Sequence, residues 1–119
     1  MEVSRYYKEL CEKYTDRTAI SGGKFEKAKL YLAGGETRTV SYYPPYPLAI
    51  VSGKGCLVRD ADGNSYIDCV NNYTSLIHGH ANEMIANAIC DAARKGTAMP
   101  AGIEDQVKLA QLLCSRVPG

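Results

Sequence analysis

The sequence has almost no net charge and no long apolar run. Its 14 lysine and arginine residues face 13 aspartate and glutamate residues, so the formal net charge is +1. This balance offers no electrostatic basis for binding nucleic acid or an anionic membrane. No apolar stretch approaches the roughly 20 residues that a membrane-spanning helix needs. The opening MEVSRYYKEL lacks the basic residues followed by an apolar run that are typical of a signal peptide. We therefore expect neither a nucleic-acid-binding nor a membrane protein.

The sequence also lacks a cysteine framework. Its 5 cysteines are widely spread and include no C-x-x-C pair, so neither a disulfide scaffold nor a zinc knuckle is expected. We expect reduced thiols that behave as small apolar residues in a cytosolic protein. His78 and His80 lie two positions apart, but no third and fourth metal ligand stands at a credible spacing. Ordinary hydrogen-bonded histidines are the favoured interpretation, and a metal site is the alternative.

Motifs for two further kinds of chemistry are missing. Counted from Asp60, the sixth position of a calcium-binding loop is Ser65 where glycine is required, and the twelfth is Asn71 where glutamate is required. The acidic segment 60–64 is therefore a turn. No Ser-His-Asp or Cys-His arrangement has supporting context. Spacing alone does not reveal an activity.

The chain does have the composition of one small folded domain. Its hydrophobic content is 45% with interspersed charge, which suits a single modest core. A break is expected at residues 15–23, which hold two glycines, and Gly34-Gly35 is expected to end the second helix. Residues 37–46 contain two prolines and are expected to run extended across a surface. Apolar side chains at helical spacing predict four helices, over residues 1–14, 24–32, 82–95 and 103–117.

Between the second and third helices the pattern predicts three short antiparallel strands. They are expected at residues 48–51, from Leu57, and at residues 66–70. Gly53-Lys54-Gly55 is the expected first turn, and the acidic segment is the second. The predicted fold class is therefore α+β, with N-terminal helices, a three-stranded antiparallel meander and two further helices.

Four blocks of the sequence together resemble the N-terminal part of class III (ω-type) aminotransferases, which depend on pyridoxal phosphate. The resemblance covers roughly residues 30–119 and is most specific in the third block. Within this class, the sequence is similar in particular to the glutamate-1-semialdehyde aminomutase group and to relatives that act on β-amino acids. The blocks are Gly34-Gly35-Glu36-Thr37-Arg38; Tyr46-Pro47-Leu48-Ala49-Ile50 with Gly53-x-Gly55; Asp60-x-Asp62-Gly63-Asn64-x-Tyr66-Ile67-Asp68 with Gly79-His80-Ala81; and Gly96-Thr97 with Glu104 and the Leu-rich helix ending Val117-Pro118.

The resemblance implies a homodimer of the type I PLP-transferase α/β fold, with active sites at the subunit interface; the cytoplasmic location is expected from the reduced cysteines. Such an enzyme transfers an amino group between an amino acid and a keto acid or aldehyde. Arg38 matches the arginine that binds the substrate carboxylate, and Tyr73 matches an aromatic wall of the substrate pocket. Gly96, Thr97 and Ala98 match a loop at the dimer interface near the partner's cofactor.

The resemblance also implies that the Schiff-base lysine and the main phosphate-binding loop stand beyond Gly119 in the family's chain. No catalytic residue is therefore expected among these 119 residues, and the chain alone is expected to be inactive. The expected parts are an N-terminal helical arm (1–33), a substrate-side segment and meander of a small domain (34–80), and helices leading into a truncated large domain (81–119). One alternative stays open. The wide apolar stripe at 103–117 also suits a non-catalytic interaction module that pairs with a longer homologue.

Overall fold

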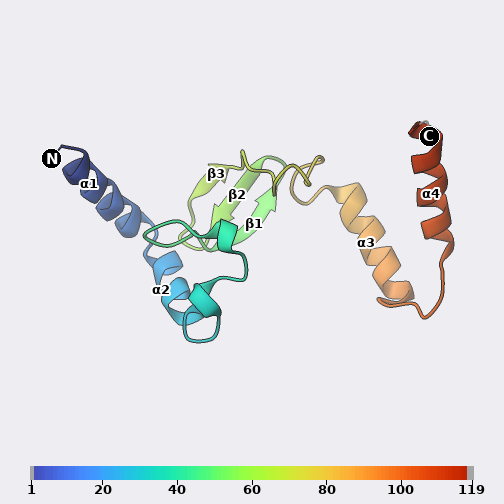
Figure 1. Ribbon diagram of the computed structural model, residues 1–119, viewed down its shortest axis with the longest axis horizontal. Helices are drawn as coiled ribbons and strands as arrows, with labels where there is room; N and C mark the ends of the chain where they lie inside the picture. Colours follow the sequence, from blue (N-terminus) through green and yellow to red (C-terminus); the bar gives the residue numbers. More distant parts are fainter. Residues whose placement is uncertain (1, 118–119) are drawn as a thin grey trace. The chain divides into compact units, whose positions relative to one another are not determined.

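A computed structural model describes residues 2–117 of the chain (Figure 1). It confirms the α+β class, with helices at the N-terminus, a three-stranded antiparallel sheet and two further helices. The chain forms two compact units, Met1–Asn82 and Glu83–Gly119. The elements in chain order are α1 (Glu2–Arg17), α2 (Ala19–Ala28), the 3-10 turns η1 (Ala33–Gly35) and η2 (Thr39–Ser41), β1 (Ile50–Lys54), β2 (Leu57–Asp60), β3 (Ser65–Ile67), α3 (Glu83–Lys95) and α4 (Glu104–Arg116).

The predicted break at residues 15–23 is wrong, because α1 and α2 run through it with Thr18 alone between them. The cause lies in the β2–β3 turn. The carboxylate of Asp62 accepts hydrogen bonds from the backbone N–H groups of Ile20 at 2.6 Å and Ser21 at 3.0 Å. A carboxylate at a helix N-terminus pairs with donors that the helix leaves unpaired and complements the helix dipole. A contact distant in sequence therefore starts α2 earlier than its local sequence indicates.

Gly22 lies inside α2 because a tyrosine ring occupies the space where a side chain would be. A Cβ atom on Gly22 would lie 2.8 Å from Cζ of Tyr46. The Tyr46 ring also packs against Tyr14, with ring centroids 5.3 Å apart. Residues 37–46 were expected to lie across a surface. That prediction is wrong in two places. Residues Thr39–Ser41 form the 3-10 turn η2 rather than an extended segment, and at the C-terminal end Tyr46 is half-buried and joins the core.

The core of the first unit is small and centred on Phe25. Among the described residues, Phe25 is the buried large apolar side chain, and its ring lies 6.0 Å from that of Tyr42 and 6.5 Å from that of Tyr46. The second helix was predicted to reach residue 32 and be ended by Gly34-Gly35; it ends at Ala28. Gly35 instead lies against the core, since a Cβ atom there would lie 2.7 Å from the Phe25 ring.

The sheet has the order β1-β2-β3 with both pairs antiparallel. The first turn is Gly55-Cys56, because Lys54 pairs with Leu57 in the ladder. The expected turn therefore started two residues early, and Gly53 is a ladder residue. Strand β3 ends at Ile67, three residues earlier than expected, because the chain turns immediately afterwards.

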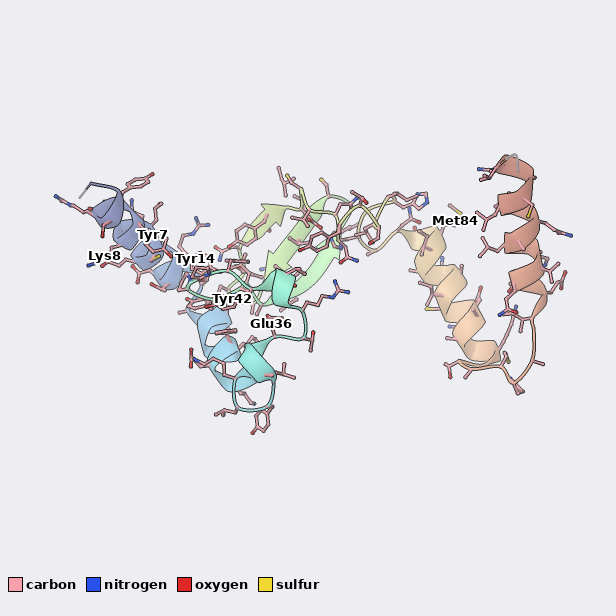
Figure 2. The ribbon with its side chains drawn as sticks, in the orientation of Figure 1. Tyr7, Lys8, Tyr14, Glu36, Tyr42 and Met84 are labelled. Atoms are coloured by element: carbon pink, nitrogen blue, oxygen red, sulfur yellow. The ribbon has the colours of Figure 1, made fainter. Side chains whose placement is uncertain are left out.

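Helices α3 and α4 of the second unit agree closely with the two predicted C-terminal helices. The start of α4 is fixed by the backbone N–H of Ile103, which donates to Oε1 of Gln106 at 3.3 Å. No side chain described on either helix is buried; Met84 at the start of α3, for example, is 76% exposed (Figure 2). Within residues 2–117, no helix is long and apolar enough to cross a membrane.

Candidate functional site

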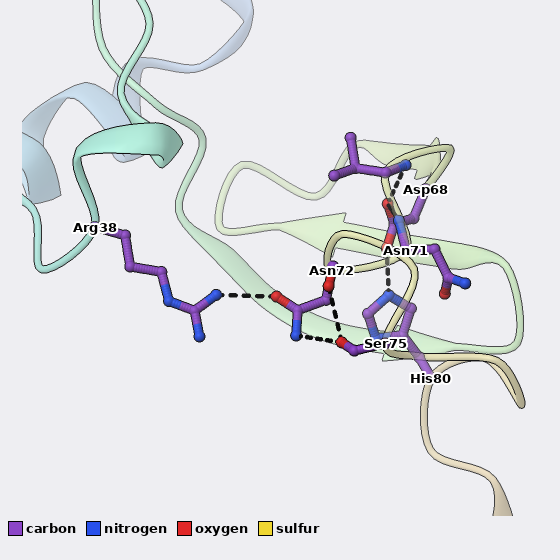
Figure 3. Close-up of polar contacts among 7 residues, drawn as sticks. Arg38, Asp68, Asn71, Asn72, Ser75 and His80 are labelled. Atoms are coloured by element: carbon purple, nitrogen blue, oxygen red, sulfur yellow. Dashed lines mark hydrogen bonds and ion pairs between the residues drawn. The ribbon is translucent and has the colours of Figure 1, made fainter.

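The chain leaves β3 through a turn that Asp68 holds in place. Its Oδ1 atom accepts hydrogen bonds from the backbone N–H groups of Val70 and Asn71, both at 2.9 Å. Its Oδ2 atom lies 2.7 Å from Nε2 of His80 (Figure 3). Hydrogen bonds to the charged form of a carboxyl favour that form. The backbone N–H of Asn71 and then His80 therefore hold the pKa of Asp68 below its ordinary value, despite partial burial.

His80 itself is fixed against the β1–β2 turn. Its backbone N–H donates to the Gly55 carbonyl at 2.8 Å, and the Gly55 N–H donates back at 2.9 Å. The imidazole lies over Gly53, where a Cβ atom would come within 2.6 Å of the ring. The predicted hydrogen-bonded role is thus confirmed for His80. In the described part of the chain, no group of three or more His, Cys, Asp or Glu residues is placed to hold a metal ion.

Four consecutive residues in the turn that follows Asp68 have left-handed backbone conformations. The φ angles are 51° at Asn71, 46° at Asn72, 56° at Tyr73 and 69° at Thr74. Asparagine tolerates this region, but aromatic and β-branched residues adopt it rarely, at a cost of order 1–3 kcal/mol each. Strain of this kind is typical of functional sites, where the surrounding structure holds it in place.

This strained turn brings the two residues singled out from the sequence to one place. Nη1 of Arg38 donates to Oδ1 of Asn72 at 2.9 Å (Figure 3). The hydroxyl of Tyr73 donates to the backbone carbonyl of Val40 at 3.3 Å. Two segments more than 30 positions apart are thus joined by two neighbouring contacts (Arg38 to Asn72, and Val40 to Tyr73). Both Arg38 and Tyr73 remain exposed to solvent.

Asn72 is the member of this site that sequence reasoning missed. Its Nδ2 donates to Oγ of Ser75 at 2.9 Å, and that hydroxyl donates to the Asn72 backbone carbonyl at 2.8 Å. The amide nitrogen is therefore occupied, and the amide oxygen is directed to Arg38. The Asn-Asn pair directly after the predicted strand 66–70 was the available signal, since asparagine favours left-handed turns.

The chemistry of this site suits a small carboxylate. A guanidinium group has several N–H donors in a planar fork. With one of them bonded to Asn72, Arg38 still has enough donors for a bidentate contact with two carboxylate oxygens. The neighbouring Tyr73 ring offers an apolar surface to the rest of such a molecule.

The loop Gly96-Thr97-Ala98 lies in the second unit, after α3. Gly96 has a φ of 138°, and its N–H donates to the Ala93 carbonyl at 3.2 Å. Met99 curls back over Gly96, where a Cβ atom would lie 2.8 Å from the methionine Cε. Thr97 and Ala98 are exposed. Their expected place near a partner's cofactor stays a prediction.

The chain belongs to the class III aminotransferases, because residues 39–119 match the family Aminotransferase class-III. It is 39% identical over 105 residues to glutamate-1-semialdehyde 2,1-aminomutase of Syntrophomonas wolfei, covering 86% of this chain and 24% of that protein. Sequence and fold therefore agree with the resemblance seen in the four blocks.

Solved structures show the same relationship and place the chain in the PLP-transferase fold. The β-phenylalanine aminotransferase from Variovorax paradoxus superposes with a TM-score of 0.93 at 31% identity, over 98% of this chain and 27% of that one. A transaminase with PLP bound superposes with a TM-score of 0.80 at 38% identity, over 83% of this chain and 23% of that one. The chain thus spans about a quarter of the length of the relatives that it matches. The cofactor of the full-length family is pyridoxal phosphate.

The lysines of the described residues do not suit attachment of this cofactor. A lysine that forms a Schiff base is activated by desolvation in a pocket or by a neighbouring cation. Every lysine in residues 2–117 is instead exposed at the surface, and the described residues therefore do not fit covalent attachment of pyridoxal phosphate. These lysines are Lys8, Lys13, Lys24, Lys27, Lys29, Lys54, Lys95 and Lys108.

Proposed function

We propose that these residues form the substrate-side part of a PLP-dependent aminotransferase or aminomutase. The enzyme transfers an amino group between an amino acid and a keto acid or aldehyde. The observation that supports this is a pair of neighbouring hydrogen bonds, one from Arg38 to Asn72 and the other from Tyr73 to the Val40 carbonyl. In the proposal, the Arg38 guanidinium binds the substrate carboxylate through two parallel hydrogen bonds, and the Tyr73 ring covers an apolar part of the substrate.

Several features of the whole protein belong to the same proposal. It is a homodimer, in which the Gly96-Thr97-Ala98 loop lies near the partner's cofactor. It works in the cytoplasm, which agrees with five cysteines that are all free thiols. These 119 residues are inactive alone, because their exposed lysines do not suit cofactor attachment. The relatives' names give both an aminomutase and an aminotransferase, and both reactions stay open for this protein.

The experiment uses the protein encoded by the complete reading frame that contains these residues, purified with pyridoxal phosphate. Amino transfer to an added keto acid is measured from β-phenylalanine and from 1-phenylethylamine, which lacks the carboxylate. The amino shift is measured with glutamate-1-semialdehyde. The Arg38→Ala variant is expected to raise KM for β-phenylalanine by about tenfold or more, because a charged hydrogen-bonded contact is lost. KM for the amine is expected to change little.

The control is Arg5→Ala, which removes an exposed arginine paired with Glu9 on α1. Its KM values are expected to match those of the unmodified protein. An Arg38→Ala variant that weakens both donors equally, or neither, would contradict a carboxylate-binding role. Absence of all three activities in the loaded protein would contradict the proposed enzyme.

The second candidate is a non-catalytic module that pairs with a longer homologue. It is favoured by the exposed apolar side chains of α3 and α4, such as Ile89 and Leu113. If the reading frame ends at Gly119, the purified chain is mixed with the β-phenylalanine aminotransferase of Variovorax paradoxus and examined by size-exclusion chromatography. Co-elution supports the module. If reduction with borohydride permanently attached pyridoxal phosphate to the chain alone, this would contradict the proposed inactivity.

A further inference from the structure

Asn72 holds the guanidinium of Arg38 while Asn72 itself is held from two sides. Its amide nitrogen is bonded to the Ser75 hydroxyl, so its amide oxygen faces Nη1 of Arg38 (Figure 3). Its backbone belongs to the left-handed turn that starts at the Asp68 carboxylate. A long arginine side chain that is ordered before a ligand arrives loses less conformational entropy on binding. This arrangement therefore prepares Arg38 for a ligand.

The chemical type of the residue that pairs with Arg38 matters as much as its position. An aspartate at this place would reach the same guanidinium with an oxygen of nearly the same geometry, but it would carry a negative charge. It would then form an ion pair with Arg38 and compete with any carboxylate that binds there. The neutral amide of Asn72 accepts the hydrogen bond and leaves the positive charge of Arg38 uncompensated.

We infer that Asn72 is a positioning and specificity-determining residue, which orients Arg38 toward the substrate carboxylate without neutralising it. The inference rests on the proposed function, because it assigns Arg38 a carboxylate ligand. It goes further in naming the residue on which the preference for carboxylate-bearing over uncharged substrates depends.

The chain offers a matched control for the test. Asn71 and Asn72 are adjacent, and both have positive φ angles, of 51° and 46°. Aspartate tolerates this backbone region much as asparagine does. The variants Asn71→Asp and Asn72→Asp therefore introduce the same charge, in the same turn, at nearly the same backbone strain. Only the second places a carboxylate at the Arg38 contact.

The experiment uses the protein of the complete reading frame and two measurements. Calorimetry gives the Kd of 3-phenylpropanoate and of its uncharged counterpart 3-phenylpropanamide, and steady-state kinetics give KM and kcat with β-phenylalanine and 1-phenylethylamine. Asn72→Asp is expected to raise Kd and KM for the carboxylates by about fivefold or more. The uncharged ligands, the value of kcat and all values for Asn71→Asp are expected to stay within about twofold. Melting curves establish that both variants are folded.

The possible outcomes separate this inference from the proposed function. If Arg38→Ala weakens 3-phenylpropanoate binding but Asn72→Asp behaves like Asn71→Asp, the inference about Asn72 is wrong and the role of Arg38 stands. If Asn72→Asp weakens the carboxylate and the amide equally, its effect is structural and the inference is also wrong. If Arg38→Ala leaves 3-phenylpropanoate binding unchanged, the proposed role of Arg38 fails, and with it the role of Asn72.

Discussion

The hydroxyl of Ser21 donates a 2.6 Å hydrogen bond to the carboxylate of Asp62 and so joins α2 to the β2–β3 turn. The same hydroxyl oxygen accepts from the backbone N–H of Ala49 at 3.2 Å. Ser21 is fully buried, with 0% of its surface exposed. One small side chain therefore connects a helix, the segment before β1 and a turn of the sheet.

Replacing Ser21 by alanine is expected to lower the free energy of unfolding by about 1–3 kcal/mol, because the half-buried N–H of Ala49 loses its acceptor and the Asp62 carboxylate loses one of its hydrogen bonds. Urea unfolding followed by tyrosine fluorescence measures the change. The matched control is Ser4→Ala on the exposed surface of α1, with an expected effect within about 0.5 kcal/mol. Equal effects of the two substitutions would show that the Ser21 contacts are not stabilising.

The two adjacent glycines of α2 are expected to respond in opposite directions to alanine. A Cβ atom on Gly23 would meet no other atom within 4 Å, whereas one on Gly22 would lie 2.8 Å from the Tyr46 ring. Gly23→Ala is expected to stabilise the protein by about 0.5–1 kcal/mol through helix propensity. Gly22→Ala is expected to destabilise it by about 1–3 kcal/mol through overpacking. Thermal and urea unfolding test the pair, and stabilisation by both would contradict the placement of Tyr46.

Helices α3 and α4 could be predicted almost to the residue because their signals are local. Apolar periodicity, acidic first turns and a glycine after Lys95 all lie within the elements themselves or directly beside them. The start of α2 could not be predicted in this way, since its carboxylate cap, Asp62, comes from a turn more than 40 positions away. Similarly, the place of Gly22 depends on Tyr46, which folding brings to it from outside the helix.

For the site, the residues themselves carried less information than the resemblance. The positions of Arg38 and Tyr73 in the sequence follow no spacing that indicates a binding site, and only the resemblance to the family singled them out. Their meeting depends on Asn72, whose contact spans 34 positions. The left-handed conformation of Tyr73 and Thr74 also opposes their local preferences. Tertiary contacts impose that conformation, so propensity could not reveal it.

Stability is expected to fall in acid because of Asp60. This carboxyl is 1% exposed and accepts hydrogen bonds from the backbone and side chain of Asn64 and from the hydroxyl of Tyr66. Burial alone would raise the pKa of Asp60, but these bonds outweigh it and lower the pKa below the ordinary 3.8. The unfolded chain therefore binds the proton more readily than the folded chain. Stability is fully present above the unfolded value and is lost as the pH falls through the folded one.

The measurement is the urea midpoint between about pH 3 and pH 7 for the unmodified protein and for Asp60→Asn. The unmodified protein is expected to lose stability below about pH 4. The variant is expected to start lower and to depend less on pH. Some dependence remains, because the pKa of Asp68 is also lowered, first by the backbone N–H of Asn71. An unchanged slope in Asp60→Asn would show that Asp60 does not contribute.

The left-handed turn predicts a stabilising substitution at Thr74. A β-branched residue with a φ of 69° is strained, and glycine adopts this conformation without a steric cost. Thr74→Gly is expected to raise the free energy of unfolding by about 1 kcal/mol. The control is Thr97→Gly, in another exposed loop where φ is not positive. It is expected to destabilise by about 0.4–1 kcal/mol, because glycine adds freedom to the unfolded chain. Destabilisation by both would contradict strain at Thr74.

The ring of Tyr73, rather than its hydroxyl, is expected to serve the substrate. The hydroxyl makes only a 3.3 Å contact with the Val40 carbonyl, and 61% of the residue is exposed beside Arg38. In the protein of the complete reading frame, Tyr73→Phe is expected to keep kcat/KM for β-phenylalanine within about threefold. Tyr73→Ala is expected to lower it by roughly tenfold or more, because the apolar wall is lost. Tyr6→Ala, an equally exposed tyrosine on α1, is the control and is expected to leave kcat/KM unchanged. If Tyr73→Phe were as harmful as Tyr73→Ala, the hydroxyl contact would be the essential feature, and the ring would not act as a wall.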